Sequence, residues 1–561
     1  MKYFLSVIGL LYYSVQGFSQ LFTPADYPRD YFRDPLAIPM SLAANFGELR
    51  PNHYHMGLDI RTQHRENLPV FAAADGYVSR VSVEPGGFGQ AIYITHPNGY
   101  TTVYGHLNQF FPALAAYVHK EQYKRESWQV YLQIPPGLFP VKKGGLIANS
   151  GNTGGSQGPH LHFEIRRTTG DVNLNPLLFG LPVPDNMPPA IVQLAWYDRN
   201  KGIYEQSPHL VPVQRASPSS AGPAPSGATA YLTTAPSLLT VPTTRISFAL
   251  SAFDTQNGSA NPNGIFEAVL FDDLRPVIGF QMDRISYDNT RNINAHIDYK
   301  TRERGGPFLQ HLSFFSGYPF PSIYRVISAG QSADPAALST LKDPPADGVL
   351  DIGDGLPHKI LIRVKDANGN ATVLSLEVKY EPSAEAIAPE KADSSEPLPF
   401  APSYIAGKSF FPGMLDGLEM SRGAFYLSEK SLYAPVPLSI SLIDFHGSGY
   451  SLRGGMSDVY RIGKPWIPLL DPVLVRLSPT AAFDVDTLPD GRWFKKAGNI
   501  VMVCTNGSHK DVKRPEWDKD TLWASARFSE FGNFQLVDDR IAPTIKPLAA
   551  LEGAKIGRAH V

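Results

Sequence analysis

His55-Met-Gly-Leu-Asp59 decides the interpretation of this 561-residue chain, because it brings an imidazole and a carboxylate close together along the sequence. Side chains alternate between the two faces of a strand, so His55, Gly57 and Asp59 are expected on one face of an extended segment. Gly57 has no side chain and would leave room between the other two. The stretch therefore predicts a strand that presents two candidate metal ligands on the same side.

A second stretch, His160-Leu-His162, follows about a hundred residues later. By the same alternation His160 and His162 would share one face, with Leu161 turned into a core. Two such strands lying side by side can aim four polar groups at one point. We interpret the pair of stretches as a split metal site.

The chemistry of such a site depends on how many of the four groups bind the metal. A catalytic zinc usually takes three protein ligands and keeps water in the fourth position, whereas four protein ligands make a structural site. Two imidazoles and one carboxylate would leave the zinc centre positively charged and able to acidify bound water. The residues alone leave open which candidate is a catalytic group and which are ligands.

Further motifs accompany these two stretches in a fixed order. They are Val70-Phe-Ala-Ala-Ala-Asp-Gly-Tyr-Val78, Gly89-Gln-Ala-Ile-Tyr-Ile-Thr-His-Pro-Asn-Gly99, Tyr104-Gly-His106-Leu107 and Gly151-Asn-Thr-Gly154, leading to Gly158-Pro-His160-Leu-His162-Phe-Glu164. With this set the sequence resembles the lysostaphin-type zinc metalloendopeptidases, peptidoglycan hydrolases with the duplicated hybrid motif fold. The resemblance covers residues 40 to 180.

The resemblance implies one Zn²⁺ ion held by His55, Asp59 and His162, with His106 and His160 as catalytic histidines. In such a mechanism the two histidines orient and deprotonate the water, stabilise the oxyanion and protonate the leaving amine. Which histidine is the acid and which the base stays open. The implied function is a secreted endopeptidase that hydrolyses peptide cross-links of bacterial cell-wall peptidoglycan.

Two other functions remain as alternatives. Some relatives lose ligands and act as non-catalytic envelope scaffolds or as activators of other wall hydrolases, but all five site residues are present here. Alternatively, the regions after the peptidase region do the main work in adhesion or assembly, through envelope protein partners. Peptidoglycan peptides are the expected substrate of the leading interpretation.

The composition fits a globular protein of several domains. Its 50 prolines, 48 glycines and 11% aromatic residues favour short strands and many turns, and so a mainly β fold. A formal net charge of -2 gives a nucleic acid no advantage as a partner. Cys504 is the single cysteine, so no intramolecular disulfide is possible.

The N-terminal segment has the features of an export signal. Residues 1–19 combine Lys2 with a short apolar stretch and small residues before a potential cleavage point, which is typical of a signal peptide. No later segment is long and apolar enough to span a bilayer. We therefore expect export to the periplasm or the cell envelope.

The chain divides into a compact antiparallel β peptidase domain and two Ig-like β-sandwich domains. An extended lead-in at residues 20–39 precedes the zinc endopeptidase domain at 40–182. That domain carries an insertion at 108–140, with helical composition at 112–127. Because the insertion follows His106 directly, we expect it to border the cleft as a wall or lid.

The remaining boundaries follow from alternating apolar runs and from proline-rich breaks. The first sandwich is expected at 188–380, a linker at 381–400 and the second sandwich at 401–548. Apolar positions on both sides of Asp366-Ala-Asn-Gly-Asn370 predict a hairpin. Residues 524–537 resemble the closing hairpin of the second sandwich. A tail at 549–561 ends in six residues that we expect to be an artefact of the gene sequence.

Overall fold

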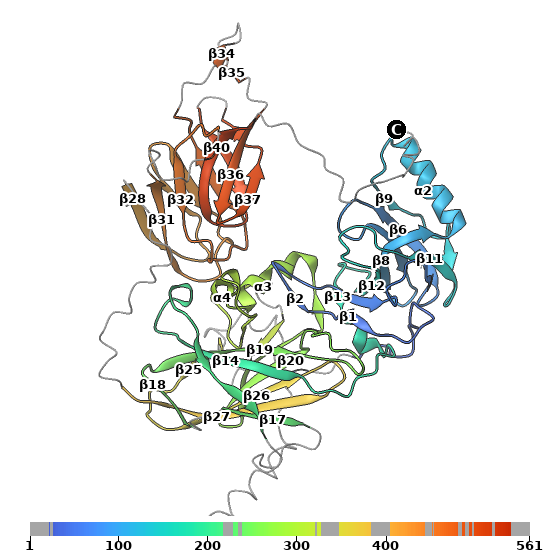
Figure 1. The fold of residues 1–561 in the computed structure, drawn as a ribbon, viewed down its shortest axis with the longest axis horizontal. Coiled ribbons are helices and arrows are strands. Elements are labelled where there is room, and N and C mark those ends of the chain that lie inside the picture. Colours follow the sequence, from blue (N-terminus) through green and yellow to red (C-terminus); the bar gives the residue numbers. More distant parts are fainter. Residues whose placement is uncertain are drawn as a thin grey trace, which may run out of the picture.

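The chain folds into three β domains (Figure 1). The computed structural model describes Phe22, Leu452 and residues 26–216, 228–233, 238–319, 323–326, 347–382, 404–443, 454–480, 485–487, 493–495, 499–518 and 522–539. The mainly β fold class is confirmed. The predicted signal peptide, the tail and almost all of the linker lie outside the described residues, and the domain boundaries stay predictions.

The first domain is built on one large antiparallel sheet. Its strands run in the order β1 (Leu42–Ala44), β4 (Leu58–Arg61), β12 (His160–Arg167), β8 (Tyr100–Phe110), β7 (Gln90–Thr95), β6 (Gly76–Val83) and β10 (Pro140–Val141). Four more strands flank this path, β5 (Pro69–Phe71), β9 (Val130–Gln133), β11 (Leu146–Ser150) and β13 (Asn173–Leu174). A separate hairpin joins β2 (Leu49–Arg50) and β3 (His53–Tyr54).

Strand β12 at the centre of this sheet has one apolar and one polar face. Leu161, Phe163 and Ile165 are fully buried in the core. His160, His162 and Glu164 alternate with them, as the pleat of a strand requires. The opposite face of β12 therefore carries the polar groups of the predicted site.

The insertion forms α2 (Pro112–Lys124) and β9. Proline stands in the first turn of α2, where its missing N–H costs no hydrogen bond. Leu114 and Val118 are buried one turn apart and attach the helix to the domain. The predicted helical stretch at 112–127 is confirmed for most of its length.

The second domain is a sandwich of two sheets. One contains β15 (His209–Val211), β14 (Ala190–Asp198), β19 (Arg245–Phe253), β23 (Gln310–His311) and β25 (Leu350–Asp351). The other contains β16 (Val213–Arg215), β17 (Thr229–Thr233), β18 (Leu238–Val241), β27 (Ala371–Tyr380), β26 (His358–Lys365), β20 (Glu267–Asp272), β21 (Arg275–Gln281) and β24 (Tyr324–Val326). Ile360 faces Leu376 and Ile362 faces Leu374 across β26 and β27, so the predicted hairpin is confirmed.

The third domain is also a two-sheet sandwich. Its larger sheet contains β28 (Tyr404–Phe410), β31 (Val436–Ile443), β32 (Val459–Ile462), β40 (Gly532–Asp538), β36 (Ile500–Asn506) and β37 (His509–Lys513). The smaller contains β29 (Asp416–Glu419), β30 (Gly423–Leu427), β33 (Val473–Leu477), β39 (Ala524–Phe528) and β38 (Glu516–Trp517), and β34 (Val485–Thr487) pairs separately with β35 (Trp493–Lys495).

The predicted closing hairpin at 524–537 is wrong. Strands β39 and β40 follow one another in the chain but belong to different sheets. The short connection between them carries Phe531, which is fully buried. The chain therefore crosses the core at this point instead of turning back within one sheet.

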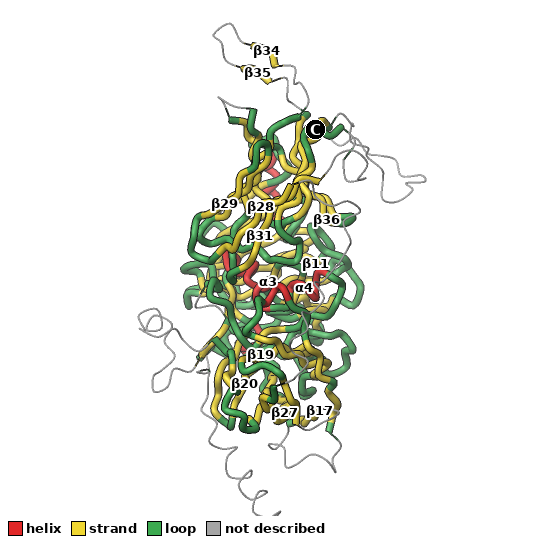
Figure 2. The backbone as a smooth tube through the Cα atoms, turned by 90° about the vertical axis from the view of Figure 1, so that its left-hand side faces the viewer, coloured by secondary structure: helices red, strands yellow, loops and turns green. Residues whose placement is uncertain are grey.

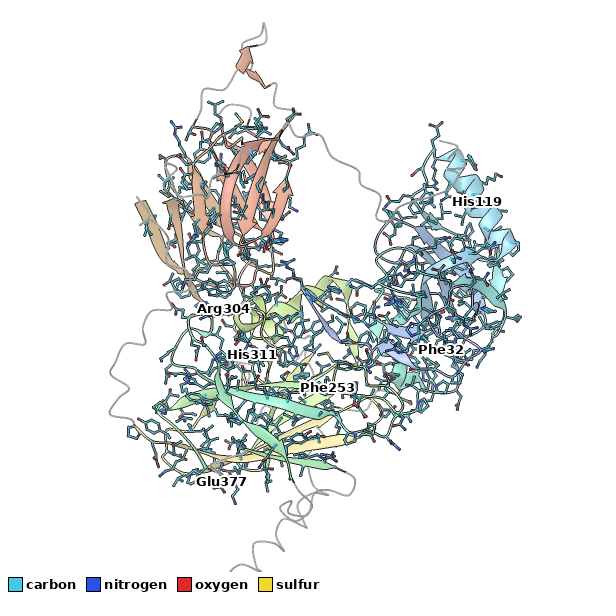
Figure 3. All side chains as sticks on the ribbon, in the orientation of Figure 1. Phe32, His119, Phe253, Arg304, His311 and Glu377 are labelled. Atoms are coloured by element: carbon cyan, nitrogen blue, oxygen red, sulfur yellow. The ribbon has the colours of Figure 1, made fainter. Side chains whose placement is uncertain are left out.

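A helical segment of the second domain lies at the junction of the three domains. It consists of η4 (Tyr287–Asn292), α3 (Ile293–His296) and α4 (Tyr299–Glu303), and Figure 2 shows α3 and α4 between strands of the two sandwiches. Just before it, β22 (Arg284–Ile285) pairs with β13 and so joins the first domain's sheet. On the other side, Arg304 lies 4.9 Å above the ring of Trp466 (Figure 3).

Within the described ranges, two further short helices are η2 (Pro176–Phe179) and η3 (Ile203–Glu205). Among the residues that the structure describes, no helix combines the length and the apolar character needed to cross a membrane.

Candidate metal centre

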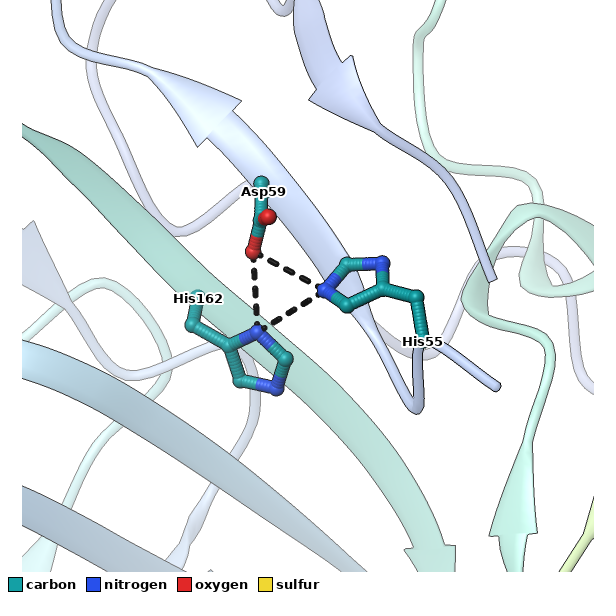
Figure 4. A group of neighbouring side chains, drawn as sticks. All are labelled: His55, Asp59 and His162. Atoms are coloured by element: carbon teal, nitrogen blue, oxygen red, sulfur yellow. Dashed lines mark hydrogen bonds and ion pairs between the residues drawn. The ribbon is translucent and has the colours of Figure 1, made fainter. Parts of the chain in front are cut away.

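The three predicted ligands lie together on the polar face of the first sheet (Figure 4). Asp59 of β4 stands directly opposite His162 of β12 in the antiparallel register. Asp59 Oδ1 is 2.9 Å from His162 Nδ1 and 3.1 Å from His55 Nε2. The two imidazole nitrogens are 3.3 Å apart. Residues about a hundred positions apart in sequence thus offer three donor atoms to one point.

The expectation that His55 and Asp59 share one strand is wrong. Strand β3 ends at Tyr54 and β4 begins at Leu58, so His55 lies in the connection between them. Its backbone N–H and carbonyl bond to Glu48 and Gly47 instead of to a ladder. Those two bonds hold the connection so that the side chain still reaches the site.

The spacing of the donor atoms fits a single zinc ion. Ligands about 2.0 Å from a tetrahedral ion lie about 3.3 Å from one another. Each histidine also has its second nitrogen occupied: His55 Nδ1 donates to the carbonyl of Asn45 at 2.7 Å, and His162 Nε2 donates to Glu164 Oε1 at 3.0 Å. These bonds fix the tautomers and leave a lone pair of each ring facing the other donors.

Glu164 is a buried carboxylate that holds His162 in place. It is fully buried and also accepts hydrogen bonds from Arg166 Nε at 2.6 Å and from the hydroxyl of Tyr287 at 2.7 Å. Burial raises the pKa of Glu164, but Arg166 and His162 outweigh this effect and lower the pKa to about 2. Glu164 is therefore charged and can act only as an acceptor. Neither Glu164 nor Tyr287 was among the predicted site residues.

The charge on Asp59 is secured by its neighbours. Burial alone would raise its pKa, but the imidazoles of His55, His160 and His162 hold the pKa well below its usual range. Arg50 adds a further positive charge, with its Nη2 3.8 Å from Asp59 Oδ2. Asp59 therefore offers an ionised oxygen to a metal at neutral pH.

The absence of a side chain at Gly57 matters for a different contact from the one expected. A Cβ atom at this position would lie 2.6 Å from the carbonyl oxygen of Phe163, 2.8 Å from Glu164 Cγ and 2.9 Å from His162 Nε2. The missing side chain thus makes room for the bond between His162 and Glu164, rather than for a gap between His55 and Asp59.

The two predicted catalytic histidines stand beside this trio. The rings of His106 and His160 have their centroids 4.6 Å apart, and His160 Nε2 is 3.3 Å from Asp59 Oδ1. His106 Nδ1 donates to the carbonyl of Thr153 and His160 Nδ1 to that of Gly158, both at 2.8 Å. Each Nε2 is thereby left as an acceptor toward the site.

His106 reaches this position through an irregularity in β8. Its φ of 57° lies in the left-handed region, which is uncommon for a residue with a side chain. The pairing of β7 with β8 shifts register here: Ile92 faces Tyr104, but Gln90 faces Leu107. A β-bulge re-aims the side chain of His106 toward the metal trio. Burial lowers the His106 pKa to about 4, assisted by His162 and His160, so the ring is neutral at pH 7.

All five predicted site residues line one cleft with a volume of about 850 Å³. Arg50, Glu84, Phe88 and Tyr287 contribute to its walls. Residues 108–140 are all described and none lines this cleft, so the expectation that the insertion borders it is wrong. The insertion approaches only indirectly, through the Tyr131 hydroxyl that donates to Glu84 Oε2 at 2.7 Å. The reason is that β9 pairs with β6, away from the edge of β12.

Comparison with known proteins identifies the first domain. Residues 53–123 and 139–176 match the sequence model of Peptidase family M23. The gap between the two matched parts lies within the predicted insertion. The resemblance to the lysostaphin-type metallopeptidases is confirmed for this domain.

Two curated relatives and one solved structure illustrate the extent of the similarity. An uncharacterized metalloprotease of Haemophilus influenzae is 37% identical over 136 residues, 24% of this chain and 22% of that protein. The DD-carboxypeptidase/endopeptidase Mpg of Neisseria meningitidis serogroup B is 33% identical over 131 residues, 23% of this chain and 24% of Mpg. The catalytic domain of lysostaphin from Staphylococcus simulans is 20% identical, with a TM-score of 0.17, over 24% of this chain and 87% of that domain.

The chain thus spans less than a quarter of the length of these curated relatives. The family-model match lies within the first domain.

Proposed function

We propose that this M23-type domain makes the protein an exported, zinc-dependent endopeptidase that hydrolyses peptide cross-links of bacterial cell-wall peptidoglycan. One Zn²⁺ ion is held by His55, Asp59 and His162, and the periplasm or the envelope is the site of action. The name of Mpg, a DD-carboxypeptidase/endopeptidase, supports this class of reaction. The donor set of two imidazoles and one carboxylate supports zinc.

A bound zinc ion would supply Lewis acidity, polarising the scissile carbonyl and making water more acidic. The chain's own residues do the rest of the work. His106 and His160 present an Nε2 acceptor each, so either can take a proton from an attacking water and later return it to the leaving amine. Their Nδ1 bonds to backbone carbonyls keep the rings oriented while the proton is held.

One observation carries this proposal. Two pairs of histidines, His55 with His162 and His106 with His160, line the same cleft, and a hydrogen bond fixes the tautomer of each ring. The proposed ligands His55 and His162 each turn a lone pair toward the point that Asp59 Oδ1 also faces. His106 and His160 stand beside them, each with one nitrogen left for a proton. A purely structural metal site needs no such second pair. The cleft, at about 850 Å³, is large enough for a peptide segment.

The test is digestion of purified sacculi by the full-length zinc-loaded protein, followed by mass spectrometry of the released fragments. Wild type is expected to release cross-link cleavage products, and His160→Ala to lose this release by about a hundredfold or more. His119→Ala is the matched control, because His119 is exposed on α2 (Figure 3) and does not line the cleft.

Equal release by wild type and His160→Ala would overturn the proposal. Failure of wild type to release any fragment, with zinc bound, would instead favour the non-catalytic envelope scaffold. The masses of the fragments identify which bond is cut.

A further inference from the structure

A second group of potential metal ligands lies in the middle domain, away from the histidine site. Asp185, Asp254 and Asp366 each offer one carboxylate oxygen, and these oxygens all lie within 4.8 Å of one another. Asp254 and Asp366 are both 3% exposed, and Asp185 is half-buried. Three acidic groups therefore meet in a space that water scarcely reaches.

The three residues come from three separate segments. Asp185 lies in the connection from the first domain to β14, Asp254 directly follows β19, and Asp366 begins the turn between β26 and β27. Figure 3 labels Phe253, the last residue of β19. The cluster thus joins the interdomain connection to both sheets of the sandwich.

Asp254 and the residue that pairs with it, Asn263, carry buried polar atoms that lack a hydrogen-bond partner. Asp254 Oδ1 is inaccessible and makes no hydrogen bond. Asn263, which pairs with Asp254 through backbone bonds of 2.8 and 2.9 Å, leaves both its Oδ1 and its Nδ2 without a partner. Orphaned buried groups of this kind are rare in folded proteins, so an additional binding partner is indicated.

The charges in the cluster are also uncompensated. Among the residues that the structure describes, no lysine or arginine forms an ion pair with any of the three carboxylates. Burial raises the pKa of Asp254 to about 8, with added repulsion from Asp185 and Asp366. Burial likewise raises the pKa of Asp366 to about 6, although Asn370 donates to it. Burial thus disfavours the ionised form of these two carboxylates, and a bound cation would offset this effect by stabilising that form.

We infer that Asp185, Asp254 and Asp366 form a Ca²⁺ site at the connection between the peptidase domain and the middle domain. Calcium binds oxygen ligands at about 2.4 Å, so oxygens up to about 4.8 Å apart can contact one ion. The absence of histidine and cysteine from this group disfavours zinc. Asn263 Oδ1 is a further oxygen of the type that calcium accepts.

A bound ion would join the interdomain connection at Asp185 to the loop between β19 and β20. The loop from Asp254 to Gly264 contacts the peptidase domain: Asn261 Nδ2 donates to the Ala43 carbonyl. Gly264 N donates to Asn45 Oδ1 at 2.9 Å, and Asn45 Nδ2 donates to the Gly264 carbonyl at 2.7 Å. Asn45 is also the residue whose carbonyl accepts from His55. The calcium site would therefore stabilise the segment that orients one of the histidine ligands.

Another acidic group in the same domain provides a contrast. Asp272, Asp273 and His358 also cluster, but His358 lies 3.2 Å from Asp272 and 3.2 Å from Asp354, and Asp273 accepts from the Lys359 N–H. Its charges are paired and it lacks an orphaned buried carboxylate. We use it as the control site.

The test uses full-length, zinc-loaded protein in calcium-depleted buffer, titrated with CaCl₂ by calorimetry and by thermal unfolding. Wild type is expected to bind one Ca²⁺ and to gain about 3 to 6 °C in Tm at saturation. Asp254→Asn should bind Ca²⁺ about tenfold more weakly or worse. Without calcium it should be at least as stable as wild type, because the substitution removes repulsion. Asp273→Asn should bind like wild type.

Asp185→Asn is a second, more exposed variant and should also weaken calcium binding. The inference is overturned if 10 mM CaCl₂ (about tenfold above the Kd of the weakest extracellular sites) leaves the Tm of wild type unchanged. It is equally overturned if Asp254→Asn retains the calcium-induced gain, or if MgCl₂ produces the same gain as CaCl₂.

Discussion

At the scale of single residues, the proposed metal centre depends on groups outside its three proposed ligands. Glu164 and the carbonyl of Asn45 each hold the second nitrogen of a histidine ligand. Removing such a partner typically lowers metal affinity by about 10- to 100-fold. The identity of the ligands therefore explains only part of the site.

Gly57 provides the first prediction at this scale. Gly57→Ala should lower zinc affinity by about tenfold or more, because the new methyl group would push Glu164 away from His162 Nε2. Competition with a chromophoric chelator measures the change. Gly86→Ala is the control, since a Cβ at Gly86 has no neighbour within 4 Å and should leave zinc affinity unchanged. Equal affinities for the two variants would contradict this account of Gly57.

Tyr287 provides the second prediction at the scale of single residues. Tyr287→Phe removes the hydroxyl that donates to Glu164 but keeps the ring below Arg166, whose guanidinium lies 4.9 Å from the ring centre. We expect zinc affinity to fall several-fold, with a stability loss of about 1 kcal/mol. Tyr131→Phe removes a similar bond, from an exposed hydroxyl to Glu84, and should leave zinc affinity at the wild-type value. A loss of stability without any change in zinc affinity would show that Tyr287 is merely structural.

At the scale of elements, the end of β7 makes the peptidase domain sensitive to acid. His96 is buried, with Nδ1 2.8 Å from the Asp75 carbonyl and Nε2 2.8 Å from Thr102 Oγ1. Burial lowers its pKa to about 4. Because the folded pKa lies below the unfolded value, the unfolded chain binds more protons between about pH 6.5 and 4. His96 therefore contributes stability that is complete above pH 6.5 and lost as the pH falls toward 4.

The corresponding measurement compares wild type with His96→Gln by denaturant unfolding across this range. At pH 7 the variant should be less stable, and the difference should shrink by about 3 kcal/mol by pH 4. A difference that stays constant with pH would mean that His96 does not titrate as its burial requires.

Elements also show which parts of the fold the sequence could predict. The hairpin of β26 and β27 was predictable because its turn, with Gly369 at a φ of 94°, lies between the two apolar patterns that it joins. The prediction of a hairpin from β39 and β40 was wrong, because the alternation of apolar and polar residues identifies a strand but not the sheet to which it belongs. A local sequence pattern can predict that two strands joined by a tight turn pair with each other. Which sheet a strand joins depends on how the whole core packs.

The candidate site follows the same rule. The five candidate site residues could be picked out from the sequence because each lies in a motif with its own spacing. Glu164 could have been found too, since it continues the alternation of His160 and His162 on β12. Tyr287 could not, because it lies 123 residues from Glu164 and no local pattern connects them.

At the scale of the whole molecule, the peptidase domain is not independent of the middle domain. Strand β22 extends its sheet by pairing with β13, and the Tyr54 N–H donates to Thr290 Oγ1 at 2.9 Å. The junction segment is in turn held by the third domain, through Arg291 Nη2 and the carbonyl of Ser529 at 2.7 Å. The two sandwiches thus contribute to the support of the metal centre.

A comparison of the full chain with residues 26–182 alone tests this dependence. The shorter protein should bind zinc more weakly than the full chain and unfold at a lower temperature. It lacks both Tyr287 and strand β22, which pairs with β13. Chelator competition and thermal unfolding provide the two measurements. Equal zinc affinity for both proteins would show that the first domain orients its ligands unaided.

The bond between Tyr287 and Glu164 also imposes an order on events during synthesis. All three proposed metal ligands have been made once the ribosome has passed His162, yet Tyr287, which donates to Glu164, is made 123 positions after that glutamate. A growing chain cannot assemble the finished centre until much of the middle domain has emerged and docked. The last contact that supports the proposed centre therefore comes from the middle domain, which is made after all three proposed ligands.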